Sequence, residues 1–228
     1  MIILGLDCSS KQSSVCIMQD EKVIYTAVQS TNITHSQNLM PMVDYALKTV
    51  DLTIKEVDLF AVTLGPGSFT GLRIGLRAIK GMAAAENKDC IGVSSLKALA
   101  ECVDFDGVIV PCFDARRNQI YGAVIDGEQT VKDDFCEDIH ILTEYVNNCQ
   151  KKICFVGDGR TVAERAFSQY ENVICDKFDM PCIAMGACKL AKKEYEKNGA
   201  VKHFDLSPSY LRLSQAEREL KEKTEAKK

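Results

Sequence analysis

The chain has 228 residues, of which 46% are hydrophobic and 26% charged, and this composition excludes the disordered, collagen-like and fibrous classes. Its 28 basic and 32 acidic residues give a formal net charge of −4. Proteins that bind nucleic acid on their own usually carry a basic excess, so this balance argues against an autonomous RNA-binding protein. No apolar run approaches the roughly 20 residues of a membrane span, and Asp7 interrupts the first one, so we expect neither a span nor a signal peptide.

The eleven cysteines form no recognisable framework. Their odd number, irregular spacing and lack of a C-x-x-C pair are a poor fit to a disulfide scaffold or a zinc site. We therefore expect reduced, mostly buried thiols in a cytoplasmic protein. Cys8 lies beside Asp7 at a predicted strand end, but the sequence places no histidine that would activate it as a nucleophile.

The first half of the chain has the pattern of a sheet flanked by helices. Apolar runs predict an antiparallel meander of three strands over residues 2–6, 15–18 and 23–28. Apolar residues at helical spacing then predict a helix over 36–50 and a long helix over 69–86, separated by a strand over 58–64. A strand over 90–93 follows, and a helix capped by Ser94 or Ser95 runs to about residue 102.

The same order begins again at residue 108. Residues 108–113 are apolar and end in Asp114, as residues 2–6 end in Asp7, and in both places a polar turn and a second strand follow. Further predicted elements are strands at 120–125, 153–156 and 172–175, and helices at 139–148, 162–170 and 183–197. We infer a duplicated α/β unit with an N-terminal lobe over 1–104 and a C-terminal lobe over 105–212. Residues 213–228 are predicted to be a charged helix or tail, with a return to the N-terminal lobe as one alternative.

Residues 65–75 read GPGSFTGLRIG and are the most informative segment. A glycine-rich turn between a strand and a helix can present backbone N–H groups to a phosphate, but the Gly-Lys-Ser/Thr of a Walker loop is missing and the spacing does not fit a dinucleotide fingerprint. Gly67, Gly71 and Gly75 recur every four residues, which predicts a helix face nearly bare of side chains. Either a helix of the same chain or a partner protein would cover that face.

This segment closely resembles the signature of the bacterial TsaB (YeaZ) family. Further matches, in the same order, are His35-Ser36 with Leu39 and Pro41, then residues 93–96, 114–116 and 208–212. The resemblance spans nearly the whole chain. It implies a two-lobed actin/sugar kinase/Hsp70-like ATPase (ASKHA, RNase H-like) α/β fold, in which a duplicated mixed sheet is flanked by helices. It also implies a role in forming N6-threonylcarbamoyl-adenosine next to the anticodon of tRNAs that read codons beginning with A.

The role that the resemblance implies is that of a non-catalytic scaffold which binds and activates the related TsaD transferase. Contact is expected through the N-terminal lobes, where helices 36–50 and 69–86 pack against the equivalent pair of TsaD. A TsaE-type ATPase joins the assembly, tRNA is bound only through the complex, and the same surface has the option of forming a homodimer when the chain is alone. The expected interface residues are His35, Leu39, Met42, Tyr45, Gly67, Gly71, Arg73, Gly75, Ala78 and Met82.

The chain departs from the TsaD pattern where that family binds a metal. TsaD-like chains carry a His-x-x-x-His motif, and the corresponding residues here are Ser95 and Leu99. Neither replaces an imidazole at a transition-metal site, so we expect no metal and no cofactor. The sequence also has no H-E-x-x-H and no G-x-S-x-G motif, so protease activity is not expected.

The nucleotide site that this fold usually holds is also altered. Asp7 is followed by Cys8 and Ser9, where nucleotide-binding members have Asp-x-Gly. We assign a vestigial nucleotide site to Asp7, Ser9, Gly157 and Gly159. Asp7 and its counterpart Asp114 are expected to remain as hydrogen-bond acceptors in their turns.

Two other functions stay open at this point. One is a nucleotide-binding, sugar-kinase-like enzyme of the same fold, which the glycine-rich helix favours and the missing Asp-x-Gly disfavours. The other is a direct tRNA-binding module, which Arg116-Arg117 and a basic stripe of Arg73, Arg77 and Lys80 favour, and which the negative net charge disfavours.

Overall fold

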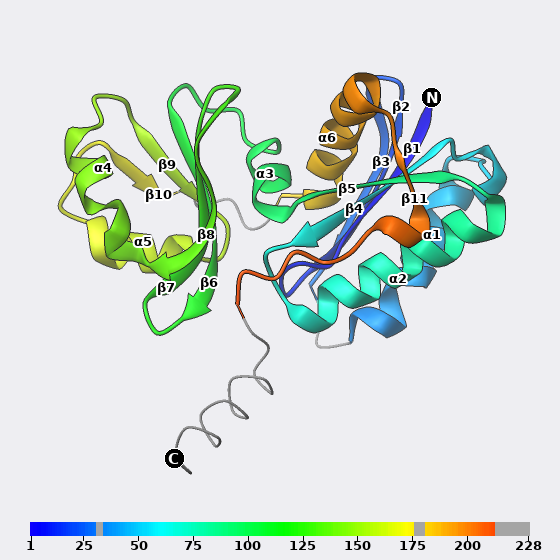
Figure 1. The fold of residues 1–228 in the computed structure, drawn as a ribbon, viewed down its shortest axis with the longest axis horizontal. Helices are drawn as coiled ribbons and strands as arrows, with labels where there is room; N and C mark the ends of the chain where they lie inside the picture. The colour runs from blue at the N-terminus through cyan, green and yellow to red at the C-terminus, as the bar shows by residue number, and fades with distance from the viewer. Residues whose placement is uncertain (31–33, 176–180, 213–228) are drawn as a thin grey trace, which may run out of the picture.

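The structure is a computed structural model that describes residues 1–30, 34–175 and 181–212, and it confirms a two-lobed α/β architecture (Figure 1). Within the described residues, one sheet has the strand order β11-β5-β4-β1-β2-β3 and the other has the order β10-β9-β6-β7-β8. Five layers alternate across the molecule: helices α4 and α5, the second sheet, helices α3 and α6, the first sheet, and helices α1 and α2.

The first sheet contains the predicted meander of β1 (Ile2–Asp7), β2 (Ser13–Gln19) and β3 (Lys22–Gln29). β4 (Leu59–Gly65) and β5 (Asp89–Ser94) continue it in parallel with β1. Residues 3–7 of β1 are all buried, as expected for a central strand covered on both faces. Helices α1 (His35–Thr49) and α2 (Phe69–Glu86) pack on one face of this sheet, and a short 3-10 turn (Ile54–Glu56) lies between α1 and β4.

The second sheet repeats this topology, which confirms the duplication. β6 (Val108–Arg116), β7 (Gln119–Asp126) and β8 (Gln129–Asp138) form a meander, and β9 (Ile153–Val156) and β10 (Val173–Cys175) run parallel to β6. β8 was not expected from the sequence, because its alternating pattern is mostly polar and half exposed. The predicted helix over 139–148 is a 3-10 turn (Ile139–Leu142) followed by α4 (Thr143–Asn148), and α5 spans Arg160–Phe167.

Helix α6 (Ile183–Asn198) corrects the predicted lobe boundary. It follows the second sheet in the chain, yet it packs against β1 and β2 of the first sheet. Gly5 of β1 makes this close contact possible, because a Cβ there would lie 2.7 Å from the carbonyl oxygen of Ala184. After α6, β11 (Val201–Lys202) pairs with β5, and a 3-10 turn (His203–Asp205) follows. The predicted C-terminal lobe over 105–212 is therefore too long, since the part from α6 onward belongs to the first lobe.

Helix α3 (Ser95–Ala100) is placed in the opposite way, with the second sheet. It belongs to the first half of the chain, and its Leu96 and Leu99 pack with Phe113 and Ala123 of the second sheet. Polar contacts from this helix and its N-cap residue reach β8, because Ser94 Oγ donates to Asp134 at 2.7 Å and Lys97 pairs with Asp133 at 3.0 Å. Each repeat thus supplies a helix that covers the sheet of the other.

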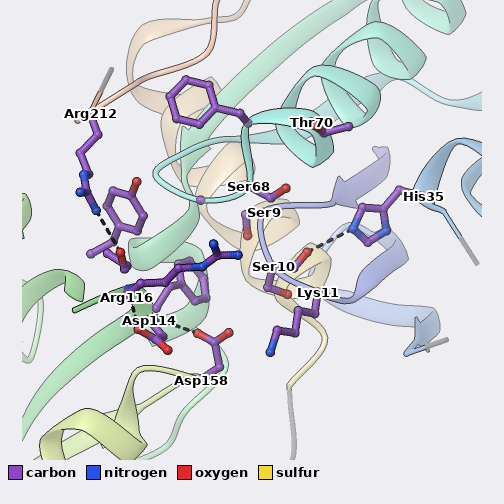
Figure 2. A pocket seen from close by; sticks show the side chains of 15 residues that line it. Ser9, Ser10, Lys11, His35, Ser68, Thr70, Asp114, Arg116, Asp158 and Arg212 are labelled. Carbon is purple, nitrogen blue, oxygen red and sulfur yellow. Dashed lines mark hydrogen bonds between the residues drawn. The ribbon is translucent and has the colours of Figure 1, made fainter. Parts of the chain in front are cut away.

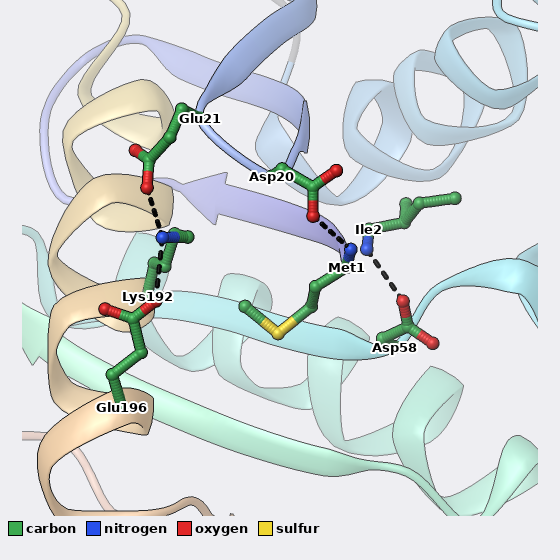
Figure 3. Close-up of polar contacts among 7 residues, drawn as sticks. All are labelled: Met1, Ile2, Asp20, Glu21, Asp58, Lys192 and Glu196. Atoms are coloured by element: carbon green, nitrogen blue, oxygen red, sulfur yellow. Dashed lines mark hydrogen bonds and ion pairs between the residues drawn. The ribbon is translucent and has the colours of Figure 1, made fainter.

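Polar contacts fix the edge of the first lobe around the chain start (Figure 3). The N-terminal ammonium of Met1 pairs with Asp20 at 2.6 Å, and the backbone N–H of Ile2 donates to Asp58 Oδ2 at 2.7 Å. Lys192 of α6 pairs with Glu21, in the β2–β3 turn, and with Glu196 one turn along its own helix. Through Glu21, α6 is tied to the meander that it covers.

Residues 203–212 form what we call the C-terminal strap, which runs along α2 toward the junction of the lobes (Figure 1). The N–H of Ser209 donates to the Leu64 carbonyl at 2.8 Å, and the ring of Tyr210 stacks on Phe69 with 4.4 Å between centroids. Arg212 then donates to the carbonyl of Ala115 in the second lobe at 2.9 Å. The charged tail predicted over 213–228 lies outside the described residues.

The cysteines are all unbridged, and most of them pack in the interior. Burial raises the pKa of Cys90 to about 11 and those of Cys102 and Cys182 to about 12. Burial and the neighbouring Asp7 raise the pKa of Cys8 even further above its ordinary value. A thiol with so high a pKa supplies almost no thiolate at neutral pH, so Cys8 does not fit the role of a nucleophile.

Candidate functional site

A cavity of about 660 Å³ opens between the lobes where the two Asp-containing turns face each other (Figure 2). The β1–β2 turn and the start of α2 contribute one wall, and the tip of the β6–β7 hairpin, the loop before α5 and the C-terminal strap contribute the other. We call it the interlobe cavity. Its lining comprises Ser9, Ser10, Lys11, His35, Gly67, Ser68, Phe69, Thr70, Phe113, Asp114, Ala115, Arg116, Tyr121, Asp158 and Arg212.

Asp7 organises the β1–β2 turn beneath this cavity. Its Oδ1 accepts hydrogen bonds from the N–H of Ser9 at 3.1 Å and from Thr63 Oγ1 at 2.7 Å. Burial raises the pKa of Asp7, and the hydrogen bonds and the nearby His35 oppose that rise only in part. The Ser9 hydroxyl lies near enough to help lower this pKa, but among the described residues its Oγ has no partner within hydrogen-bond geometry. The expectation that Asp7 is a turn acceptor is confirmed.

Asp114 has the same role in the second lobe. Its Oδ1 accepts from the N–H of Arg116 at 2.7 Å, and its own N–H donates to Asp158 Oδ1 at 3.0 Å. Arg116, Arg117 and Asn118 all have positive φ angles, of 66°, 55° and 58°, which tighten the hairpin tip. This left-handed run directs the hairpin into the cavity region.

Gly157 and Gly159 do not line the cavity. They let the loop before α5 press against β6, because the N–H of Gly159 donates to the Cys112 carbonyl at 3.1 Å and a Cβ on Gly159 would lie 2.9 Å from the Cys112 carbonyl carbon. Of the predicted nucleotide-site residues, the cavity therefore includes Ser9, with Asp7 just beneath it, and the two glycines have a packing role.

The glycine face of α2 is covered within the chain, mainly by the β1–β2 turn and at Gly71 also by His35 at the start of α1. A Cβ on Gly71 would collide with the carbonyl oxygen of Cys8, and one on Gly67 would collide with that of Ser9. A Cβ on Gly75 would touch Cys8 and Val62 at 3.7 Å. The glycines recur every four residues because α2 docks directly onto the β1–β2 turn.

Four other predicted interface residues also have partners within the chain. Leu39 is 1% exposed in the core, and Met42 is half-buried and accepts a hydrogen bond from Ser13 Oγ at 3.6 Å. His35 lies 3.1 Å from the Ser10 carbonyl through its Nε2 and lines the interlobe cavity. Arg73 donates from its Nε to the Tyr210 hydroxyl at 2.8 Å, so it faces the C-terminal strap.

A second concave surface lies between α1 and α2. This groove has a volume of about 470 Å³, and we call it the α1/α2 groove. It includes Ala78 and Met82, which were expected at an interface, while the third such residue, Tyr45, is 66% exposed on α1 outside it. The lining residues that the sequence analysis missed are Met40, Val43, Asp44, Leu47, Ile54, Arg77, Gly81 and Ala85.

Gly81 is the residue that the sequence analysis most clearly overlooked. A Cβ at this position would have no atom within 4 Å, in contrast to Gly71 and Gly75 on the same helix. A glycine at an exposed helical position lowers helix propensity, and no packing contact inside the chain requires it here. That mismatch was the available signal that this part of α2 faces an open groove.

The position of the TsaD metal motif is filled by packing and hydrogen bonding. Ser95 Oγ accepts from the N–H of Gly65 at 3.1 Å, and Leu99 is 1% exposed. Over residues 1–30, 34–175 and 181–212, no three His, Cys, Asp or Glu side chains are grouped so that they could bind a metal ion. In the same ranges, every helix is too short or too polar to cross a membrane.

Comparison with known proteins agrees with this geometry. The family model described as TsaD, tRNA N6-adenosine threonylcarbamoyltransferase, matches residues 28–201. The ROK hexokinase of Thermus thermophilus superposes with a TM-score of 0.52 at 10% identity, covering 86% of this chain and all of that one. The two duplicated lobes therefore have an ASKHA-like fold.

Two further similarities define the family more closely. The chain is 30% identical to the tRNA threonylcarbamoyladenosine biosynthesis protein TsaB of Haemophilus influenzae, over 93% of this chain and 94% of that one. YeaZ from Pseudomonas aeruginosa superposes with a TM-score of 0.77 at 22% identity, covering 92% of this chain and 99% of that one. The chain belongs to the TsaB (YeaZ) family.

Proposed function

We propose that the chain is a non-catalytic subunit of the machinery that makes threonylcarbamoyl-adenosine in tRNA, and that it binds and activates a TsaD-type transferase in the cytoplasm. Membership of the TsaB family supports the role in this biosynthesis. The observation that carries the docking proposal is the α1/α2 groove, whose apolar lining stays open in the chain alone.

The chemistry of the groove suits a pair of helices from the partner. Its floor is apolar, Met40 is 45% exposed at its edge, and Gly81 leaves room for a close backbone approach. Asp44 and Arg77 on its rim supply charges of opposite sign that can fix the orientation of a partner. The proposed occupant is the equivalent helix pair of the TsaD-type chain, with a second copy of this chain as the competing occupant.

The proposal that the chain is non-catalytic rests on the side chains at two places. Ser95 and Leu99 supply no ligand set of the TsaD type. Asp7, whose carboxylate would be the acidic group of a nucleotide site, is fully buried and accepts from Ser9 and Thr63. A TsaE-type ATPase is proposed to join the TsaD complex, which also binds the tRNA.

A pair of variants on α2 tests the docking surface. Gly81→Leu fills the groove and should abolish co-purification with the TsaD-type transferase, because the added side chain occupies the space of the partner. Ala84→Leu adds the same side chain at an exposed position of α2 that does not line the groove, and it should bind normally. Unchanged thermal unfolding shows that both variants are folded. Undiminished binding by Gly81→Leu, or equal loss in both variants, would rule out this surface.

Reconstitution tests the assigned role. Threonylcarbamoyl-adenylate and tRNA should yield modified tRNA when the transferase, the TsaE-type ATPase and this chain are all present, and much less when this chain is omitted. The chain alone should neither modify tRNA nor hydrolyse ATP. ATP turnover by the chain alone would favour the kinase-like enzyme, and salt-resistant tRNA binding by the chain alone would favour the RNA-binding module.

A further inference from the structure

A basic strip follows α2 and the C-terminal strap, which runs along this helix (Figure 1). The strip consists of Arg73, Arg77, Lys80 and Arg212. Its three residues on α2 recur at positions i, i+4 and i+7, so they lie along one side of the helix. The helix and the strap contain two carboxylates, those of Glu86 and Asp205, although acidic residues outnumber basic ones in the whole chain. Positive charge is therefore concentrated on this surface.

The cations of the basic strip contact uncharged acceptors of the chain. The Lys80 ammonium donates to the Phe204 carbonyl at 3.4 Å, and Arg73 donates to the Tyr210 hydroxyl at 2.8 Å. Arg212 likewise donates to a backbone carbonyl of the second lobe. Over residues 1–30, 34–175 and 181–212, none of the four cations forms an ion pair with a carboxylate. Their contacts with the chain position the side chains without neutralising their charge.

Two aromatic rings of the strap lie beside these cations. Phe204 is 66% exposed and belongs to the 3-10 turn that contacts Lys80. Tyr210 is 39% exposed and lies against Arg73. Surfaces that bind RNA combine these two kinds of side chain, because cations contact phosphates while exposed rings stack on unpaired bases. The strap and α2 together have this combination.

We propose that the basic strip contacts the phosphate backbone of the tRNA while the chain is docked on the TsaD-type transferase, and that an unpaired base stacks on Phe204. This inference rests on the proposed function, which brings an RNA to the complex. Arg77 belongs to the strip and also lines the α1/α2 groove, so the RNA and the transferase would lie side by side on α2. RNA is favoured over an acidic protein because the exposed rings beside the cations suit bases.

Fluorescence anisotropy of a labelled, unmodified tRNA, titrated with the purified complex of this chain and the transferase, measures the contact. Lys80→Gln and Arg73→Gln should each weaken binding by about three- to tenfold and lower the salt slope by about one, since each removes a phosphate contact. Phe204→Ala should weaken binding by about fivefold or more without changing that slope.

Two variants serve as controls. Lys22→Gln removes the same charge from an exposed lysine of β3, at the edge of the first sheet opposite β11, and should bind tRNA normally. Tyr210→Phe removes the hydroxyl that Arg73 contacts but keeps the ring and the arginine charge, so it should also bind normally. Co-purification with the transferase and thermal unfolding check that every variant is docked and folded.

The outcomes separate this proposal from the proposed function. A wild-type chain that forms no complex with the transferase would contradict the proposed function and this inference with it. A complex that forms normally and binds tRNA equally well with Lys80→Gln and Arg73→Gln would overturn the basic strip alone. An equal loss of affinity in Lys80→Gln and Lys22→Gln would also overturn it, because the effect would then come from the overall charge of the chain.

Discussion

Arg73 on α2 donates a hydrogen bond from its Nε to the hydroxyl of Tyr210, with 2.8 Å between the two atoms, and its guanidinium carbon lies 5.5 Å from the centre of the same ring. The Tyr210 ring stacks on Phe69 at the start of the helix. Arg73, which belongs to the basic stripe predicted on α2, therefore binds the C-terminal strap. The strap in turn reaches the second lobe through Arg212.

Removing the Tyr210 ring should therefore loosen the strap. We expect Tyr210→Ala to lower the free energy of unfolding by about 1–2 kcal/mol, from the lost stacking and the lost hydrogen bond. Tyr210→Phe keeps the stacking and should lose less than half of that. Urea denaturation measures both, and limited proteolysis should cut the strap faster in Tyr210→Ala only. Equal proteolysis of wild type and Tyr210→Ala would show that the stacking does not hold the strap.

Two glycines of the same helix should respond to alanine in opposite directions. Gly71→Ala places a Cβ against the Cys8 carbonyl and should destabilise the chain by about 1–3 kcal/mol, because backbone must move. Gly81→Ala adds a methyl group that would have no neighbouring atom within 4 Å, and it should stabilise the chain by about 0.5–1 kcal/mol through helix propensity. Urea denaturation of both variants measures the contrast. A Gly71→Ala variant as stable as the wild type would contradict the close contact of α2 with the β1–β2 turn.

The buried carboxyl of Asp7 should give the stability an acid-range pH dependence. Because its pKa in the folded chain is raised above the ordinary value of 3.8, the folded state binds more protons than the unfolded state in that window. The contribution of Asp7 to stability is then largest at low pH, and it falls as the pH rises through the folded pKa. Asp7→Asn cannot ionise, so it should gain stability relative to the wild type as the pH rises toward neutrality.

Urea midpoints of wild type and Asp7→Asn across the acid range test this sign, since the other carboxyls cancel in the difference between them. A stability difference that does not change with pH would show that Asp7 ionises normally in the folded chain.

Thiol labelling should separate the buried cysteines from reactive ones. Burial raises the pKa values of Cys8 and Cys112 well above those of free thiols, and both side chains are at most 1% exposed. We expect neither to react with an alkylating agent at neutral pH until urea unfolds the chain. Mass spectrometry of labelled peptides identifies the modified residues. Rapid labelling of native Cys8 would restore it as a candidate nucleophile.

Local sequence patterns predicted most helices and strands, but they did not show against which sheet each helix packs. The helix predicted over 69–86 is observed with those limits, because Ser68 caps its start and Asn87 ends it in a left-handed conformation. The repeated strand-Asp-turn pattern correctly predicted that Asp7 and Asp114 hold equivalent turns. β8 was missed because a half-exposed strand lacks an apolar run.

Long-range packing explains what the sequence could not reveal about the sites. Spacing shows that Gly71 lies on a bare helix face, but only the fold shows that the Cys8 backbone covers it. The apolar pattern of α6 marks a helix without showing that it packs on the first sheet. Lys11 and Arg116 are distant in the chain and line the same interlobe cavity only because the two repeats face each other.

The crossing of α3 and α6 between the repeats makes the molecule resemble a domain-swapped dimer joined into one polypeptide. Division of the chain near residue 104 would leave each sheet with a helix in the wrong fragment. Neither half is then a module that can be expressed, transplanted or unfolded by itself, and the two halves should refold only when mixed. We therefore regard the two lobes as one cooperative folding unit.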